Sequence, residues 1–188
     1  RENTEGLGLE NTDIELRPNG TIVVDEFCQT AVENVFAVGD VNGGLQFTYV
    51  SLDDFRVVNG YLHGNKEYTT ADRKNVPYST FISPALSHVG LHKEEAEAAN
   101  PNVAVASLPV ANMPRGAVNQ DPRGLFRVTV DKDTNLILGA TLFGKNSEEI
   151  INLIKMAIDN KIPYTYIRDQ IFTHPTMAEN LNDVFKLI

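Results

Sequence analysis

The sequence contains one cysteine, no apolar run long enough to cross a membrane and no excess of basic residues. Cys28 alone cannot form an internal disulfide or a dithiol redox centre, and we expect a small, partly buried side chain. A bilayer span takes roughly 20 apolar residues, and the net charge is −9, so membranes and nucleic acids are not expected partners. The opening also lacks a basic and apolar leader, which predicts a cytoplasmic protein.

Length and composition are typical of a globular protein. With 188 residues, of which 42% are hydrophobic and 22% charged, the chain can form one sizeable core or two small ones. Residues 65–75 are polar and lack apolar periodicity, which predicts a connector between two domains. We therefore predict two domains, residues 1–72 and residues 73–188.

Residues 1–72 are predicted to form an incomplete α/β segment. Strands are expected at 20–25, after a turn signal, and at 35–38, which is apolar on both faces like a buried parallel strand. The second strand ends in Gly39-Asp40. A glycine there lets a ligand approach the backbone, and an aspartate can accept hydrogen bonds from a sugar or polyol, although Gly-Asp also begins ordinary turns. In the helix that follows, apolar positions spaced by three and four are expected to face the core: Leu52, Phe55, Val58 and Leu62.

Residues 73–188 alternate short β-rich runs with helical patterns. Arg127 and Thr129 alternate with apolar neighbours, so one face of their strand is expected to be wet. Ser147 is predicted to be the N-cap of a helix with a buried apolar stripe. The order of elements predicts an α+β fold, an antiparallel sheet with helices on one face. The predicted strands are 78–82, 103–110, 125–130 and 136–144, with a loop at 112–122 and helices at 94–99, from 147 and from about 165.

His174 is the histidine whose surroundings look most suited to chemistry, since an imidazole can accept and donate a proton near neutral pH. It precedes a T-x-x-E pattern that predicts a helix opening at Thr176, with Glu179 as the capping-box partner of the Thr176 amide. Alternatively, Glu179 orients the His174 ring and stabilises its imidazolium form. The spacing alone favours the cap, and one carboxylate can do both.

His88 and His92 lie four residues apart, a spacing that on a helix would suit a metal ion. We expect a strand and a turn at these positions, which breaks that geometry, and no third ligand is evident. No metal site is therefore predicted.

Three motifs resemble those of the flavoprotein disulfide reductases. Residues 30–40 are similar to the second flavin-binding motif of that family, residues 84–91 to the opening of its interface domain, and residues 174–179 to its C-terminal signature. The resemblance covers nearly the whole chain. It implies that residues 73–188 are the dimerisation domain of a homodimer. Residues 1–72 would be the end of an FAD/NAD-binding region whose N-terminal domains lie upstream.

The resemblance also implies roles for particular residues. His174 would enter the active site of the other subunit and exchange protons with a redox cysteine and the substrate, with Glu179 as its partner. The cofactors would be FAD and NAD(P)H. Asp40 would bond the ribityl chain, and the helix N-terminus would face the flavin ring. The implied FAD-binding residues are Gly39, Asp40, Gln46, Phe47 and Thr48.

Further expectations follow from the same resemblance. The chain would be the C-terminal part of a longer enzyme, nearest to the mercuric-reductase-like, reactive-chlorine-resistance branch, and inactive alone because the redox cysteines are absent. The His174–Pro175 peptide would be cis, and apolar edges within residues 1–70 would be exposed. Tyr49 departs from the pattern, since many relatives have proline there. The alternative function is a dimerisation module in which His174 is buried against the partner subunit and has only a packing role.

Overall fold

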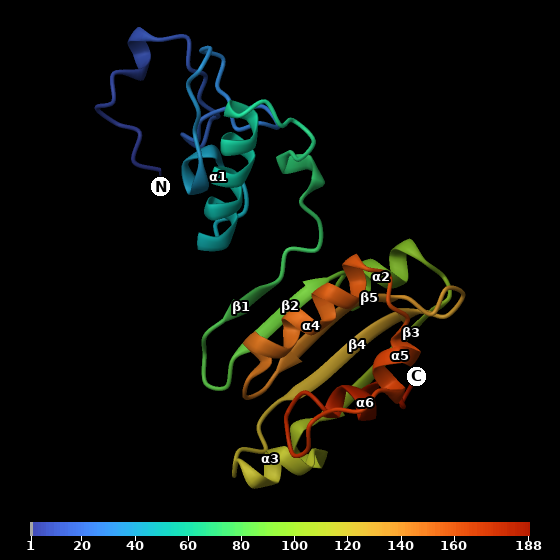
Figure 1. Ribbon diagram of the computed structural model, residues 1–188. Coiled ribbons are helices and arrows are strands. Elements are labelled where there is room, and N and C mark those ends of the chain that lie inside the picture. The colour runs from blue at the N-terminus through green and yellow to red at the C-terminus, as the bar shows by residue number, and fades with distance from the viewer. Residues whose placement is uncertain (1) are drawn as a thin grey trace. The chain divides into compact units, whose positions relative to one another are not determined.

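The computed structural model describes residues 2–188, which separate into two compact units with the boundary between Lys74 and Asn75. We call these the N-terminal and C-terminal units and describe each by itself (Figure 1). None of the described helices is both long and apolar enough to span a membrane.

The C-terminal unit is built on a five-stranded antiparallel sheet with the order β1-β2-β5-β4-β3. This confirms the predicted α+β fold. The central strands are long, apolar on the inner face and joined by a short turn, so neighbouring pairs such as Val128 and Ala140 stand side by side. The strands are β1 (Tyr78–Thr80), β2 (Leu86–Gly90), β3 (Val103–Pro109), β4 (Leu125–Asp131) and β5 (Ile137–Phe143).

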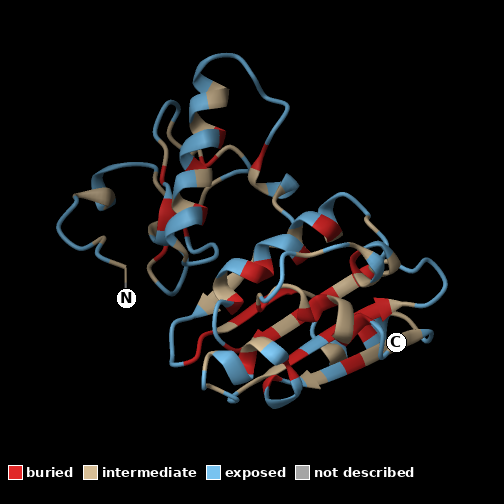
Figure 2. Ribbon diagram, turned by 60° about the horizontal axis from the view of Figure 1, so that its bottom comes forward, coloured by how far each residue is buried: buried red, intermediate tan, exposed pale blue. Residues whose placement is uncertain are grey.

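Helices supply the other half of the core. Figure 1 shows α4, α5 and α6 lying across the sheet, and the apolar faces of these helices join the inner strand residues in one buried cluster. Figure 2 shows buried positions concentrated along the strands and the inner faces of these helices. Ile150, Ile151, Ile154 and Ala157 form the predicted stripe of α4. The helices are α2 (Lys93–Ala99), α3 (Pro114–Val118), α4 (Ser147–Asp159), α5 (Tyr164–Asp169) and α6 (Asn180–Phe185).

Three local predictions for this unit were wrong. Residues 112–122 are not only loop, because Pro114 begins the short helix α3. Ser147 is not the N-cap, which is Asn146. The Ser147 hydroxyl is buried and donates to the Ala85 carbonyl at 2.8 Å. On the strand face predicted to be wet, Arg127 is exposed but Thr129 is buried: the pairing neighbour of Thr129 is Gly139, and the backbone of Leu91 lies directly against that glycine.

The N-terminal unit contains one long helix, α1 (Thr48–Leu62), and three 3₁₀ turns, η1 (Leu9–Asn11), η2 (Gly39–Asn42) and η3 (Thr70–Asp72). The strands predicted at 20–25 and 35–38 are wrong. Only isolated antiparallel bridges form, Leu16 with Ile22 and Gln29 with Phe36. Within the described residues no parallel strand pairs with 35–38, so Val35 and Val38 are exposed rather than buried.

The buried face of α1 also differs from the prediction. Leu52 and Phe55 are 44% and 56% exposed, whereas Val50, Asp54 and Val57 are buried. A charged side chain therefore occupies the inner face of the helix, which an apolar-periodicity rule cannot anticipate. The exposed apolar side chains expected in this segment are present.

The connector is more ordered than its composition suggested. The Thr69 amide donates to the Asp72 carboxylate at 2.9 Å, which caps η3. The Thr70 amide donates to the Glu26 carbonyl at 3.0 Å. Residues 69–73 are thus fastened to the N-terminal unit.

Candidate functional site

His174 lies in the segment between α5 and α6, and its peptide bond to Pro175 is cis. The Nδ1 atom of the ring is 2.8 Å from Oε2 of Glu179. Because an ionised carboxylate can only accept, Nδ1 carries the hydrogen and Nε2 is the nitrogen left to exchange a proton. The His174 side chain is 72% exposed, whereas that of Glu179 is 15% exposed. The imidazole is thus held from one side and presented outward.

Glu179 contacts both groups named in the two interpretations, the His174 ring and the Thr176 backbone. Its second oxygen, Oε1, accepts from the Thr176 amide at 3.0 Å, and the Glu179 amide donates to the Thr176 hydroxyl at 3.2 Å. This is a capping box, although the regular helix begins at Asn180 rather than at Thr176. Partial burial opposes ionisation of Glu179, but hydrogen bonds from His174 and Thr176 hold the pKa of its carboxyl below the usual value.

Two asparagines, which the sequence reasoning missed, hold this segment. The buried Asn180 side chain donates to the Thr176 and Met177 carbonyls at 3.2 and 3.0 Å. Asn182 donates to three carbonyls at the end of α5 and just beyond it, the shortest bond being 2.7 Å to Ile167. Asn180 therefore fixes the turn that carries His174 to α6, and Asn182 fixes α6 to the end of α5.

The predicted cofactor residues lie together in the N-terminal unit. Gly39 has φ +72°, and a Cβ atom there would stand 2.8 Å from the Ser51 hydroxyl of α1, so glycine is needed for the turn to meet the helix. Asp40 follows with an exposed side chain. Gln46, Phe47 and Thr48 form the entry to α1, with Gln46 and Thr48 exposed and Phe47 half-buried.

Asp54 was not anticipated from the sequence. It is 1% exposed, and its Oδ2 atom accepts from the Gly39 amide at 2.7 Å and from the Asn42 side chain at 3.0 Å. Asn42 in turn accepts from the Gly44 amide at 3.0 Å. One buried carboxylate of α1 therefore fixes the turn that carries Gly39 and Asp40. The sequence gives no local signal for this role, because the partners of Asp54 lie 15 and 12 residues away in the chain.

Comparison with known proteins identifies the chain. Residues 76–185 match the dimerisation domain of the pyridine nucleotide-disulphide oxidoreductases, and residues 1–54 match the pyridine nucleotide-disulphide oxidoreductase domain model. The chain belongs to the pyridine nucleotide-disulphide oxidoreductase family. This confirms the resemblance to the flavoprotein disulfide reductases.

Individual relatives agree with this assignment. The probable pyridine nucleotide-disulfide oxidoreductase RclA of Escherichia coli K12 is 49% identical over 98% of this chain and 42% of its own length. The dihydrolipoyl dehydrogenase of Bacillus subtilis 168 is 32% identical over 96% of this chain and 38% of its own length. A solved structure of the Cu(II) complex of the HOCl-induced flavoprotein disulfide reductase RclA from E. coli aligns with a TM-score of 0.97 at 47% identity, over all of this chain and 44% of that one. The chain thus spans about two fifths of these relatives.

We call the C-terminal unit the dimerisation unit from here on, because residues 76–185 match the dimerisation domain. In it, His88 and His92 form a stacked pair, with ring centroids 3.7 Å apart and planes 11° apart. The Gly90 carbonyl accepts from Nε2 of His88 at 2.9 Å, so Nδ1 accepts from the Thr141 hydroxyl, also at 2.9 Å. Burial lowers the pKa of His88 below its usual value. Stacked rings direct their nitrogen lone pairs in parallel rather than at one point. Among residues 2–188 no group of three metal-binding side chains gathers.

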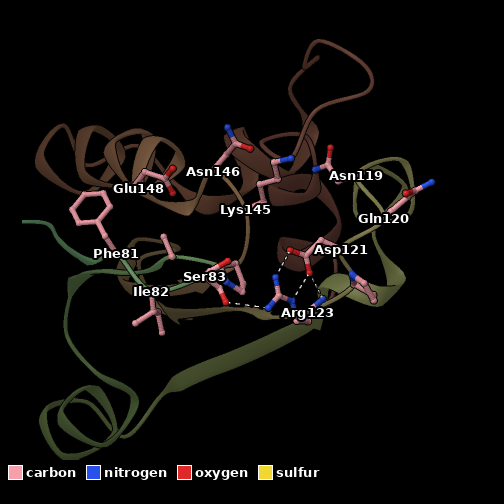
Figure 3. Close-up of a pocket in the computed structure, with 13 residues that line it drawn as sticks. Phe81, Ile82, Ser83, Asn119, Gln120, Asp121, Arg123, Lys145, Asn146 and Glu148 are labelled. Carbon is pink, nitrogen blue, oxygen red and sulfur yellow. Dashed lines mark hydrogen bonds and ion pairs between the residues drawn. The ribbon is translucent and has the colours of Figure 1, made fainter.

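The dimerisation unit also contains a surface pocket of about 750 Å³ between the loops 81–85 and 119–123 and the start of α4 (Figure 3). Arg123 at its wall donates to Asp121 at 2.7 Å and to the Ser83 carbonyl at 3.1 Å, and it lowers the pKa of Asp121 to about 2. Its charge is already paired. Neither His174 nor Glu179 lines the pocket, so the pocket does not coincide with the His174–Glu179 pair.

Proposed function

We propose that this chain is part of an FAD- and NAD(P)H-dependent disulfide-reductase-like oxidoreductase. In it, His174 and Glu179 serve as an acid–base pair for the redox cysteines of a partner subunit. The observation that carries the proposal is that the His174 ring is both held in place and accessible. Its Nδ1 atom is 2.8 Å from Glu179, while its side chain is 72% exposed. A histidine that packed only within its own subunit would be enclosed by that core, and the His174→Gln substitution below separates proton exchange from packing against a partner.

The geometry supports proton exchange at Nε2 of His174. Disulfide exchange proceeds through a thiolate, so a nearby base must take the thiol proton and later return it. When Nε2 accepts that proton, the ring becomes an imidazolium, and the Glu179 carboxylate at Nδ1 stabilises the positive charge. The bond to Thr176 keeps the carboxylate in place throughout. The pair can therefore cycle between both protonation states without moving.

The thiol partner is expected from another part of the assembly. Cys28 is the only cysteine in the sequence, and it is fully buried. Its pKa is raised to about 12, chiefly by desolvation, so the reactive thiolate is disfavoured. For this reason we also expect the 188-residue chain alone to be inactive.

An exposed apolar side chain beside His174 supports assembly into a homodimer through residues 73–188. Ile171, three residues before the imidazole, is fully exposed, and Tyr166 of α5 is also exposed. Apolar surface next to a reactive group is typical of a face that another protein covers. The match to a dimerisation domain agrees with this reading.

The N-terminal unit fits FAD in two respects. Gly39 lets the turn lie directly against α1, because a Cβ there would stand 2.8 Å from the Ser51 hydroxyl, and this brings Asp40 close to the start of the helix. Asp40 offers an exposed carboxylate for hydroxyl groups of the ribityl chain, next to the helix entry at Gln46, Phe47 and Thr48. FAD bound there would accept a hydride from NAD(P)H and supply electrons to the cysteine pair.

Replacing His174 by Gln in the flavin-loaded enzyme tests the proposal, with His63→Gln as the matched control because His63 is an exposed histidine outside the dimerisation unit. General acid–base catalysis is worth about 10² to 10⁴ in rate, so His174→Gln should lose that much turnover while the dimer stays intact. Retained turnover in an intact dimer would leave only the packing role.

Mixed dimers show whether the pair acts across the subunit interface. A His174→Gln subunit is combined with a subunit whose redox cysteines are replaced. If the pair serves the partner, half of the sites in the hybrid have both components and activity returns. If His174 serves its own subunit, no site in the hybrid is complete and activity stays lost.

A further inference from the structure

Asp54 has a third bond that the proposed chemistry does not use. Its Oδ1 atom accepts from Nη2 of Arg73 at 2.6 Å, while Oδ2 holds the turn at Gly39. Arg73 therefore neutralises the carboxylate from the side opposite to the turn. An unpaired carboxylate at this depth would be strongly unfavourable.

Arg73 makes this bond as one arm of a fork. Its Nε atom donates to Asp53 at 2.8 Å, and both side chains of that second pair are 14% exposed. Asp53 also accepts from the Tyr68 hydroxyl at 2.9 Å. A planar guanidinium can span two neighbouring carboxylates, whereas a lysine ammonium acts as a single point charge. The residue type is thus matched to the site.

The position of Arg73 is fixed by the ordered connector that precedes it. It is the second-last residue of the N-terminal unit and directly follows η3, whose cap and whose bond to Glu26 fasten the connector. The guanidinium is therefore supplied by the segment that leads into the dimerisation unit.

We infer that Arg73 is a positioning residue for the turn that carries Gly39 and Asp40, which we call the cofactor turn. It acts through Asp54 on the Gly39 amide. Without it, Asp54 must move toward water, and the bonds to Gly39 and Asn42 lengthen or break. The turn then loses the geometry that aims Asp40. The positioning of the turn stands on the contacts alone, whereas its consequence for FAD rests on the proposed function.

Amide hydrogen exchange of Gly39 in the 188-residue chain tests the positioning directly. Arg73→Met should raise this exchange at least about tenfold, since one partner of a buried ion pair is lost, while the Val57 amide inside α1 changes less. Arg56→Met is the matched control, because Arg56 contacts Asp53 at 3.5 Å and the Tyr49 hydroxyl at 3.1 Å, is 50% exposed, and has no ion pair with Asp54 among the described residues. Equal Gly39 exchange in the two variants overturns the inference.

Arg73→Lys covers the case in which Arg73→Met unfolds the unit and raises Gly39 and Val57 exchange together. It keeps the charge but cannot span both carboxylates. Faster Gly39 exchange with a protected Val57 amide supports the inference, and wild-type exchange at Gly39 overturns it.

The FAD dissociation constant of the assembled enzyme then tests the consequence, with Asp40→Asn measured beside Arg73→Lys. Both variants are expected to bind FAD more weakly. If only Asp40→Asn does so, the inferred effect of Arg73 on the cofactor is wrong. If Asp40→Asn binds FAD normally, the proposed role of Asp40 fails, and the exchange result still decides whether Arg73 positions the turn.

Discussion

Glu179 serves His174 and the cap of α6 with different atoms, so substitutions can separate the two roles. Oε2 accepts from His174 and Oε1 accepts from Thr176. Glu179→Gln retains an oxygen for the Thr176 amide but removes the negative charge beside the ring. Thr176→Val does the reverse, since it removes the hydroxyl that accepts from the Glu179 amide and leaves the carboxylate in place.

The expected changes in the free energy of unfolding and in turnover are large enough to be measured. A capping interaction is worth about 1 kcal/mol, so Thr176→Val should lower the free energy of unfolding by about that much. The His174–Glu179 bond is largely exposed on the histidine side and adds at most about 1 kcal/mol to stability, so Glu179→Gln should change stability little. Its effect on turnover should be on the order of 10- to 100-fold, or about 1.4 to 2.7 kcal/mol of transition-state stabilisation.

Two assays check this pattern. Urea unfolding followed by circular dichroism gives the free energy of unfolding, and NAD(P)H oxidation by the flavin-loaded enzyme gives kcat across pH. We expect Glu179→Gln to lose much more activity than Thr176→Val and less stability. If activity falls in proportion to stability in both variants, Glu179 is only a helix cap and the acid–base argument is wrong.

Three further predictions concern the folded state. Burial lowers the pKa of His88 below 6.5, so the unfolded chain binds the proton more readily. The stability that neutral His88 contributes is present above about pH 6.5 and is lost as the pH falls below it. Urea unfolding should therefore show a smaller loss between pH 7.5 and 5.5 for His88→Asn than for the wild type. A Cβ at Gly139 would lie 2.1 Å from the Leu91 carbonyl, so Gly139→Ala should cost about 1 to 3 kcal/mol in the same assay, and a neutral result would show that the strand can shift. Cys28 is fully buried with a pKa of about 12. It should resist iodoacetamide at pH 8 until urea unfolds the chain, and labelling of the native protein would contradict this.

Most of the dimerisation unit was predictable because its signals are local. Strand alternation around the turn at 131–136 predicted the hairpin of β4 and β5, and the apolar stripe predicted α4. The errors arose where a distant segment decides burial. Thr129 reads as a wet position until Leu91 is placed over its neighbour Gly139. Ser147 reads as a cap until its hydroxyl is drawn to the Ala85 carbonyl.

The N-terminal unit was less predictable because its apolar runs do not pair with one another. The run at 35–38 has the composition of a buried parallel strand, yet within the described residues it makes a single antiparallel bridge. In α1 the sequence pattern favours Leu52 and Phe55 for the inner face, but Asp54 occupies it. An ion pair with Arg73, 19 residues away, compensates the buried charge, and no helical periodicity contains that information.

In both units a carboxylate fixes a turn, but its partners lie at different separations along the sequence. That separation decides whether the sequence alone reveals the arrangement. In each unit one poorly exposed carboxylate accepts from a backbone amide of a turn and from a second functional group. Glu179 does so with partners three and five residues away, and it is visible as a T-x-x-E spacing after a histidine. Asp54 does so with a glycine 15 residues earlier and an arginine 19 residues later. The proposed acid–base residues could therefore be named in advance, while the residue that holds the turn proposed to bind FAD could be found only from the fold.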